Sequence, residues 1–206
     1  MPGFRMGLPG CFYADRSDVP FHKSIFLQQA GFDVKMMNAV LVSKLSDYAD
    51  WLELAKEVEP LFGPMVDDTA FCDGLKQAIR EGRAFCASEP DEDGRSMFHG
   101  GIVISKDANE ILWLAVSGDF RGRGAGAALL SEAVGRLDRN RPIIVTTFDR
   151  TITAGLPARR LYQRLGFTDS AAAGLNPAGI PTVTMTLEMR SDGSRCLQPD
   201  EPAGSR

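Results

Sequence analysis

The distribution of apolar residues along the chain predicts alternating strands and helices. Short apolar runs that are continuous or alternate with polar residues, and are rich in β-branched and aromatic side chains, predict strands. These runs occupy residues 39–42, 83–88, 97–105, 110–116, 143–148 and 182–189. Only short turn segments separate the runs between residues 83 and 116, which predicts a meander of antiparallel hairpins there.

Two helices are predicted before the meander. Ser46 is placed to cap the first helix, and Pro60, Gly63 and Pro64 are expected to break it. Asp67 and Asp68 are placed to cap the second, whose apolar residues recur every four positions until Gly82 ends it.

Two more helices are predicted after the meander. Leu129 begins an apolar stripe that reaches Leu137, and Pro142 is expected to stop this helix. Pro157 suits the first position of a short helix that Gly166 ends.

The two ends of the chain lack these periodic patterns. Residues 1–35 carry glycines, prolines and isolated aromatics, and we expect an N-terminal extension that is poorly ordered or accessory. Residues 191–206 are rich in Ser, Asp, Gly and Pro and are predicted to be a disordered tail. Residues 36–190 then form one domain of ordinary size.

Composition limits the kind of partner and site. A net charge of −4 argues against nucleic acid and favours a cationic substrate. Four scattered cysteines and two histidines support neither a metal site nor a disulfide framework, and they suit a reducing cytoplasm. No signal peptide or bilayer-spanning run is visible, so we expect no membrane association.

The strongest functional signal is the turn Arg121-Gly122-Arg123-Gly124-Ala125-Gly126, which lies between a predicted strand and a predicted helix. Glycines let backbone approach a ligand closely, and a helix N-terminus favours an anion. The arginines can donate paired hydrogen bonds to phosphate oxygens. The turn therefore predicts a pyrophosphate site.

Two patterns compete for this turn. Gly122-x-Gly124-x-x-Ala127 satisfies a dinucleotide-binding fingerprint, with Asp149 as its ribose-binding acid. The preceding antiparallel meander argues against that fold. The turn also fits Arg/Gln-x-x-Gly-x-Gly/Ala, and so resembles the acyl-CoA pyrophosphate loop of the GNAT superfamily of N-acetyltransferases.

A second segment resembles the same superfamily. Ala158-Arg159-Arg160-Leu161-Tyr162-Gln163-Arg164-Leu165-Gly166-Phe167 is similar to the GNAT pattern Ala-x-x-Leu-Tyr-x-x-x-Gly-Phe. Gly155 departs from it, because GNAT proteins often have Asn there. The resemblance implies an α/β fold with a mixed, largely antiparallel central sheet and helices on both faces; the subfamily is unassigned.

The resemblance also implies roles for individual residues. Acetyl-CoA would be bound by the central strand and the loop, and backbone N–H groups near Val116 would hold the thioester oxygen. Glu110 resembles the general base of the histone-acetylating branch, and Tyr162 would protonate the departing thiolate. The implied cofactor-binding residues are Leu114, Ala115, Val116, Arg121, Gly122, Arg123, Gly124, Ala125, Gly126 and Ala127.

The resulting hypothesis is transfer of an acetyl group from acetyl-CoA to a primary amine of a small molecule or protein, by direct attack on the thioester. A non-catalytic acyl-CoA-binding module is the first alternative, and a nicotinamide-dinucleotide enzyme is the second. The acceptor and the oligomeric state, including a homodimer, stay open at this point.

Overall fold

A seven-stranded sheet forms the centre of the protein. The computed structural model describes residues 39–90 and 96–188 of the 206. The strand order is β1-β2-β3-β4-β5-β7-β6, and every neighbouring pair is antiparallel except β4 and β5. The strands are β1 (Ala39–Val42), β2 (Ala84–Pro90), β3 (Ser96–Ser105), β4 (Glu110–Val116), β5 (Ile143–Phe148), β6 (Thr168–Leu175) and β7 (Pro181–Leu187). The expected mixed, largely antiparallel sheet is confirmed.

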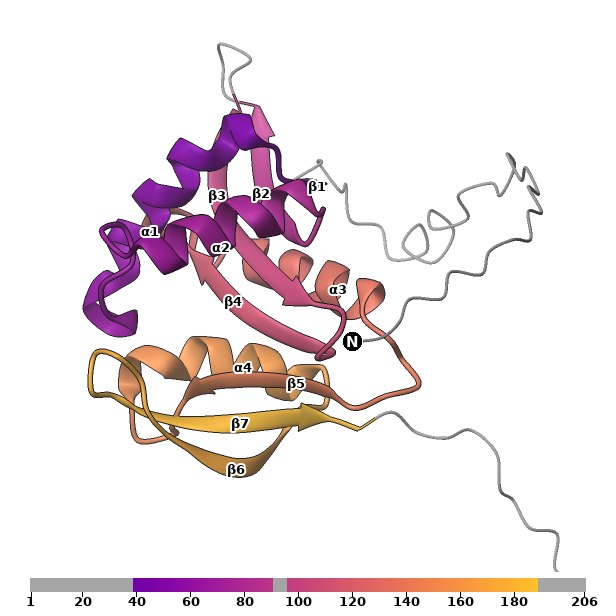
Figure 1. The fold of residues 1–206 in the computed structure, drawn as a ribbon. Helices are drawn as coiled ribbons and strands as arrows, with labels where there is room; N and C mark the ends of the chain where they lie inside the picture. Colours follow the sequence, from indigo (N-terminus) through magenta and orange to yellow (C-terminus); the bar gives the residue numbers. More distant parts are fainter. Residues whose placement is uncertain (1–38, 91–95, 189–206) are drawn as a thin grey trace, which may run out of the picture. The chain divides into compact units, whose positions relative to one another are not determined.

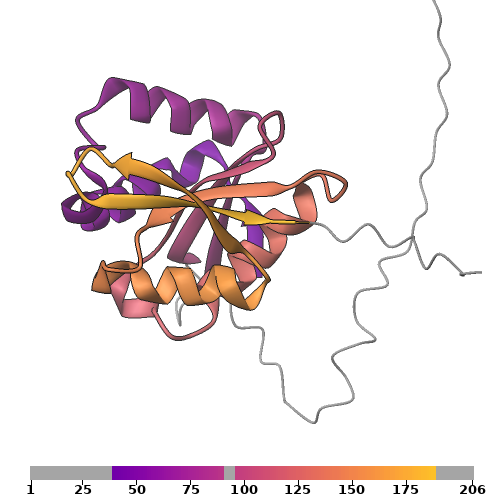
Figure 2. The same cartoon turned by 90° about the horizontal axis from the view of Figure 1, so that it is seen from below.

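Helices cover both faces of this sheet, as expected (Figures 1 and 2). On one face, α1 (Tyr48–Phe62) packs against β3 and β4, and α2 (Thr69–Arg80) packs against β2 and β3. On the other face, α3 (Ala125–Arg136) packs against β1 to β4, and α4 (Leu156–Arg164) packs against β5. Short 3-10 helices precede α1, α3 and α4: η1 (Leu45–Asp47), η2 (Gly118–Phe120) and η3 (Thr153–Gly155).

The side chains of β3 alternate between these two faces because successive strand residues point to opposite sides. Ile102 and Ile104 are buried in the core under α3 and α4. Val103 lies in a separate core with Trp51 of α1. A Cβ atom on Gly101 would lie 2.4 Å from the Trp51 ring, so glycine at this position lets α1 pack closely on the sheet.

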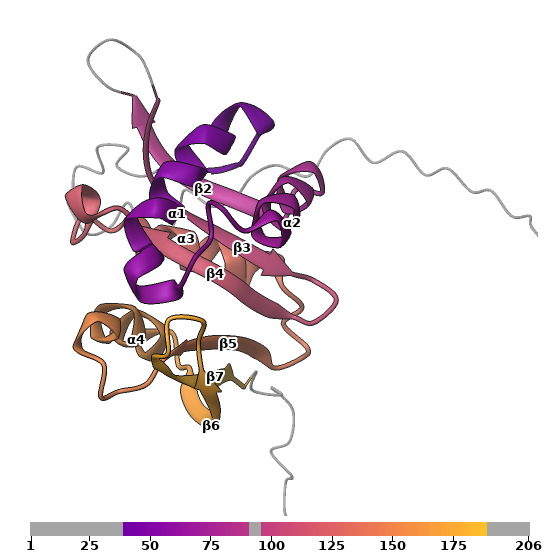
Figure 3. The ribbon, with the colours of Figure 1, turned by 60° about the vertical axis from the view of Figure 1, so that its left-hand side comes forward.

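β4 and β5 pair only at their first residues. Glu110 lies opposite Ile144 and Ile111 opposite Val145, and the two strands then diverge (Figures 1 and 3). The two strands thus form a V, whose closed end is the paired end at Glu110 and Ile111. The side chain of Asn109 stabilises this closed end. Its amide donates to the carbonyls of Asp138, Arg141 and Pro142, and its oxygen accepts from the Asp138 N–H. The divergence opens the sheet in its middle.

Three predictions about element boundaries need correction. Pro60 lies inside α1, which continues to Phe62 and is capped by Gly63, another of the predicted breakers, where φ is 97°. The buried face of α1 is packed on the sheet, and this packing maintains the helix beyond the proline. α3 ends at Arg136, well before Pro142.

The third correction concerns β6. The apolar pattern predicts no strand at residues 168–175, where the structure has β6. All of its residues are exposed, so it lacks the apolar alternation that would reveal a strand in a sequence. The predictions for residues 1–35 and 191–206 lie outside the described part of the chain.

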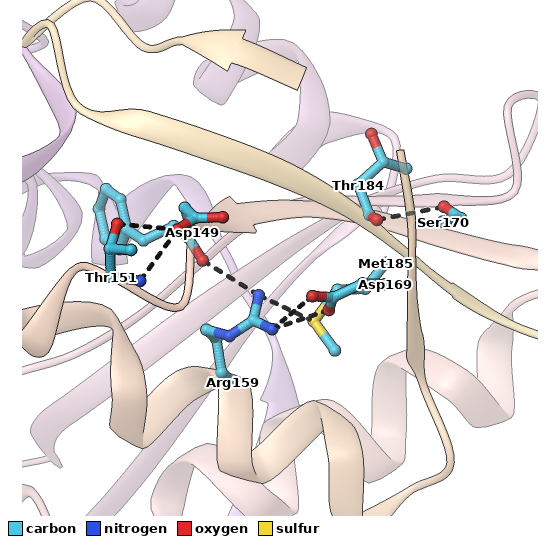
Figure 4. A network of polar contacts seen from close by, with 8 residues as sticks. Asp149, Thr151, Arg159, Asp169, Ser170, Thr184 and Met185 are labelled. Atoms are coloured by element: carbon cyan, nitrogen blue, oxygen red, sulfur yellow. Dashed lines mark hydrogen bonds and ion pairs between the residues drawn. The ribbon is translucent and has the colours of Figure 1, made fainter. Parts of the chain in front are cut away.

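A buried arginine ties α4 to the sheet. Arg159, only 4% exposed, donates to both carboxylate oxygens of Asp169 in β6 at 2.8 Å (Figure 4). It also donates to the Phe148 carbonyl at the end of β5, at 3.2 Å. Because a buried guanidinium needs such partners, this network fixes α4 next to the opening between β4 and β5.

We expect Arg159→Met to lower the free energy of unfolding by about 3 kcal/mol, because the Phe148 carbonyl loses its charged donor and α4 loses its anchor. Asp169→Asn should cost less, about 1 kcal/mol, because the Asp169 side chain is 41% exposed. Denaturant unfolding would measure both. Arg139→Met, at an exposed position, is the matched control and should change stability by less than about 0.5 kcal/mol. Equal losses for Arg159→Met and the control would contradict the anchoring role.

Candidate active site

The glycine-rich turn connects η2 to α3. Gly122 and Gly124 have φ values of 78° and 92°, in the left-handed region that favours glycine. Gly124 caps α3, which begins at Ala125. The predicted placement of the turn at a helix N-terminus is therefore confirmed. The first backbone N–H groups of a helix have no hydrogen-bond acceptor within that helix.

A carboxylate of α1 fixes the start of this loop from the other face of the sheet. The Oε1 atom of Glu57 accepts from the Gly118 N–H at 2.7 Å. The same oxygen lies 3.8 Å from the Arg121 guanidinium, whose Nε donates to the Val116 carbonyl at 3.1 Å. Arg121 is thereby held at the open end of β4.

An aromatic stack supports the middle of the loop. The Phe120 ring stacks on the buried His99 imidazole with 4.0 Å between centroids, and the Arg123 guanidinium lies 5.3 Å from the Phe120 centroid. Burial lowers the pKa of His99, as does the nearby Arg123, whereas Glu89 at 3.6 Å raises it. His99 thus contributes to the support of the loop.

A cavity of about 730 Å³ joins the loop to the opening between β4 and β5. Its wall contains every predicted cofactor-binding residue except Arg123, which lies against Phe120 instead. The remaining lining residues come from α1, η2, β5, η3 and α4. They are Val58, Leu61, Phe62, Phe120, Phe148, Thr153, Ala154, Gly155, Pro157, Ala158, Arg160, Leu161 and Arg164.

The two predicted catalytic residues do not line this cavity. Tyr162 is 3% exposed, its ring packs edge-on against Phe167 at 5.6 Å, and burial raises the pKa of its hydroxyl. Glu110 lies at the closed end of the V, where partial burial raises the pKa of its carboxyl group. The catalytic roles of both residues stay predictions.

The dinucleotide interpretation is not supported by the fold. Such a site requires a parallel, doubly wound sheet, whereas β4 and β5 are the one parallel pair among the described strands. Asp149 accepts hydrogen bonds from the N–H and hydroxyl of Thr151 in the turn after β5 (Figure 4). It does not line the cavity.

Family comparison agrees with this geometry. The sequence profile of the acetyltransferase (GNAT) domain matches residues 69–189, which is more than half of the chain. The chain belongs to the GNAT acetyltransferase family. No curated protein sequence matches it.

Solved GNAT structures share the fold. A GNAT-family acetyltransferase from Bacillus cereus is 16% identical, with a TM-score of 0.58 over 75% of this chain and 99% of that one. YncA from Salmonella typhimurium, a putative acetyltransferase solved with its cofactor acetyl-CoA, is 15% identical, with a TM-score of 0.56 over 76% and 96%. NAA60 from Arabidopsis thaliana, solved with a bisubstrate analogue, is 16% identical, with a TM-score of 0.55 over 73% and 97%.

Some lining residues of this GNAT domain escaped sequence analysis. Arg160 and Arg164 are four residues apart on α4, a spacing that could have placed both on one helix face. Leu61 and Phe62 carry no comparable signal, because only packing of α1 across the sheet brings them to the cavity. Among residues 39–90 and 96–188, no cluster of three or more His, Cys, Asp or Glu side chains could hold a metal ion. No helix within these ranges is long and apolar enough to cross a membrane.

The departure from the GNAT motif at Gly155 has a steric explanation. A Cβ atom there would lie 2.5 Å from the Phe148 Cβ, and the Phe148 ring occupies the neighbouring space. An Asn side chain at this position is therefore incompatible with Phe148 as placed. The cavity wall at η3 is formed by backbone and by the Phe148 ring instead.

We expect Gly155→Ala to lower the free energy of unfolding by about 1–3 kcal/mol, because Phe148 has to move away from the added methyl group. Gly135→Ala in α3 is the matched control, since nothing lies within 4 Å of its added Cβ atom. The control should raise stability by about 0.5–1 kcal/mol through helix propensity. Thermal and denaturant unfolding would measure both changes, and an unaltered stability of Gly155→Ala would refute the steric explanation.

Proposed function

We propose that this GNAT protein transfers an acetyl group from acetyl-CoA to a primary amine. The observation that carries the proposal is the cavity that joins an arginine- and glycine-rich helix N-terminus to the opening between β4 and β5. This arrangement suits a long ligand with phosphates at one end and a reactive group at the other. The acetyl-CoA of YncA and the bisubstrate analogue of NAA60 support the same assignment by analogy.

The residues of the cavity fit acetyl-CoA along its length. Pyrophosphate would bind at the N-terminus of α3, where the backbone N–H groups, the helix dipole and Arg121 all favour an anion. Arg160 and Arg164 add positive charge on the α4 wall. Beyond Ile111, β4 is no longer paired with β5, so its backbone can hydrogen-bond an extended ligand chain.

Acetyl-CoA supplies an activated thioester, and the protein must position the amine and move protons. A lysine-like amine with a pKa near ~10.4 is mostly protonated at neutral pH and must lose a proton before it can attack. As the new C–N bond forms, backbone N–H groups near Val116 would stabilise the oxyanion. The C–S bond then breaks, and the departing thiolate takes up a proton.

Tyr162 and Glu110 are our candidates for the two proton transfers. The Tyr162 hydroxyl is protonated at neutral pH, as a proton donor requires, although burial raises its pKa and so makes it a weaker acid than an ordinary tyrosine. Glu110 is four residues before Leu114, the first β4 residue to line the cavity, which is about 13 Å along an extended strand. A role for Glu110 as the base would therefore need a chain of water molecules to carry the proton.

A non-catalytic acyl-CoA-binding module is the second candidate function. One observation favours it: among the described residues that line the cavity there is no Asp, Glu, His or Tyr. A module of this kind would be stabilised by acetyl-CoA without releasing CoA in the presence of a broad panel of amines. Measurable CoA release with any amine would exclude it.

Arg121→Ala should raise the Kd for acetyl-CoA by about 10- to 100-fold, the value of one or two charge-assisted hydrogen bonds. Arg123→Ala is the matched control and should have a smaller effect on affinity, because Arg123 lies against Phe120 and not on the cavity wall. Isothermal titration calorimetry would measure both affinities. Unchanged affinity of Arg121→Ala would remove the pyrophosphate assignment.

Tyr162→Phe should lower kcat by about 100-fold or more while the Kd for acetyl-CoA stays the same, because only proton donation is lost. Steady-state kinetics with a reactive amine, together with calorimetry, would separate the two effects. Phenylalanine keeps the ring contact with Phe167, so the fold should be preserved. Normal turnover by Tyr162→Phe would leave this residue only its packing role.

A further inference from the structure

One end of the cavity is apolar. Val58, Leu61 and Phe62 come from α1, which lies on the face of the sheet opposite to α3 and α4. Phe148 closes this end from β5, with its ring 5.2 Å from that of Phe62. A cosubstrate bound along α3 would reach the opening between β4 and β5 from one face, so its acceptor would enter from the α1 face.

The charges around the cavity disfavour an acceptor with several positive charges. The charged residues on the cavity wall are Arg121, Arg160 and Arg164, and no Asp or Glu among the described residues lines it, so a second positive charge on the acceptor would meet no carboxylate there. Two carboxylates of α1, which do not line the cavity, have other partners. Glu57 accepts from Gly118, and Glu59 accepts from the N–H groups of Met65 and Val66, which lower its pKa.

The apolar wall is held in place by the β6–β7 loop. The Asn176 side-chain amide donates to the Leu61 carbonyl at 2.7 Å, and its oxygen accepts from the N–H groups of Ala178 and Ile180. Next to this bond, a Cβ atom on Gly63 would lie 2.7 Å from the Pro177 side chain, so the two loops are in close contact. Leu61 and Phe62 therefore belong to a preorganised surface.

From these observations we propose that the acceptor is a primary amine attached next to an aliphatic or aromatic group and carrying no second positive charge. The apolar group would lie against Leu61, Phe62 and Phe148, and the amine would point toward the opening of β4 and β5. Burial of an apolar side chain stabilises the complex, whereas an additional ammonium group would lose its hydration without a carboxylate to replace it. This inference rests on the proposed acetyl transfer.

The test uses the full chain with acetyl-CoA and compares acceptors of matched size. Release of the CoA thiol is the measurement. Phenethylamine and isopentylamine represent small apolar amines, peptides with N-terminal Phe or Leu represent polypeptide sources, and spermidine and a peptide with an internal Lys represent charged acceptors. We expect at least one of the two sources, the small apolar amines or the peptides with N-terminal Phe or Leu, to react with a kcat/KM about tenfold or more above that for spermidine. Whether the small amines or the peptides react faster identifies the source.

Leu61→Glu tests the same idea in the protein. It places a carboxylate on the apolar wall while the backbone carbonyl that Asn176 binds is retained. We expect a loss of about tenfold or more in kcat/KM for phenethylamine and a relative gain for spermidine, with unchanged Kd for acetyl-CoA. Leu41→Glu on the exposed β1 strand, outside the cavity, is the matched control and should keep the original preference. Phe62→Leu, which keeps the wall apolar, should keep the preference for apolar amines.

The outcomes separate this inference from the proposed function. Equal or faster turnover of spermidine by the unaltered protein would overturn the acceptor class while acetyl transfer stands. In that case a separate groove beside Phe120, lined by Asp50, Glu53 and Glu57, would be the candidate site for the cationic acceptor. Binding of acetyl-CoA without turnover of any amine would overturn the proposed function itself.

Discussion

The divergence of β4 from β5 is the constraint on which the rest of this structure depends. Two parallel residue pairs join the strands, and Asn109 binds the connection between α3 and β5 at the same closed end. Because hydrogen bonding stops after Ile111, the core of the sheet is interrupted where α1, α3 and α4 come together. The cavity is a direct result of this interruption, and side chains from both faces of the sheet can reach it.

The elements around the opening are fixed by contacts from several directions. Glu57 holds the start of the phosphate loop from one face of the sheet, and the stack of His99, Phe120 and Arg123 supports it from the other side of the loop. Arg159 anchors α4 to β5 and β6. The proposed anion-binding site would therefore need no large rearrangement before it accepts a ligand, which would lower the cost of binding.

The chemistry of the cavity changes along its length. One part of its wall combines Arg121, Arg160 and Arg164 with the N-terminus of α3, and another part is built from Leu61, Phe62 and Phe148. On the proposed function, this arrangement would let one cavity accept an anionic cosubstrate and an apolar amine from opposite faces of the sheet.

The sequence by itself determined the features that depend on local order. Turn glycines, the Asp68 cap and the apolar periods predicted most strands and helices, and the Arg121 to Gly126 pattern predicted the phosphate loop and the family. These signals are local because backbone conformation and helix capping depend on neighbouring residues.

Tertiary structure alone decided the rest. The continuation of α1 past Pro60, the pairing of the exposed β6 and the apolar end of the cavity all depend on packing between segments distant in sequence. The position of Tyr162 inside the core, and of Glu110 at the closed end of the V, follows from the same long-range packing, which no local pattern records.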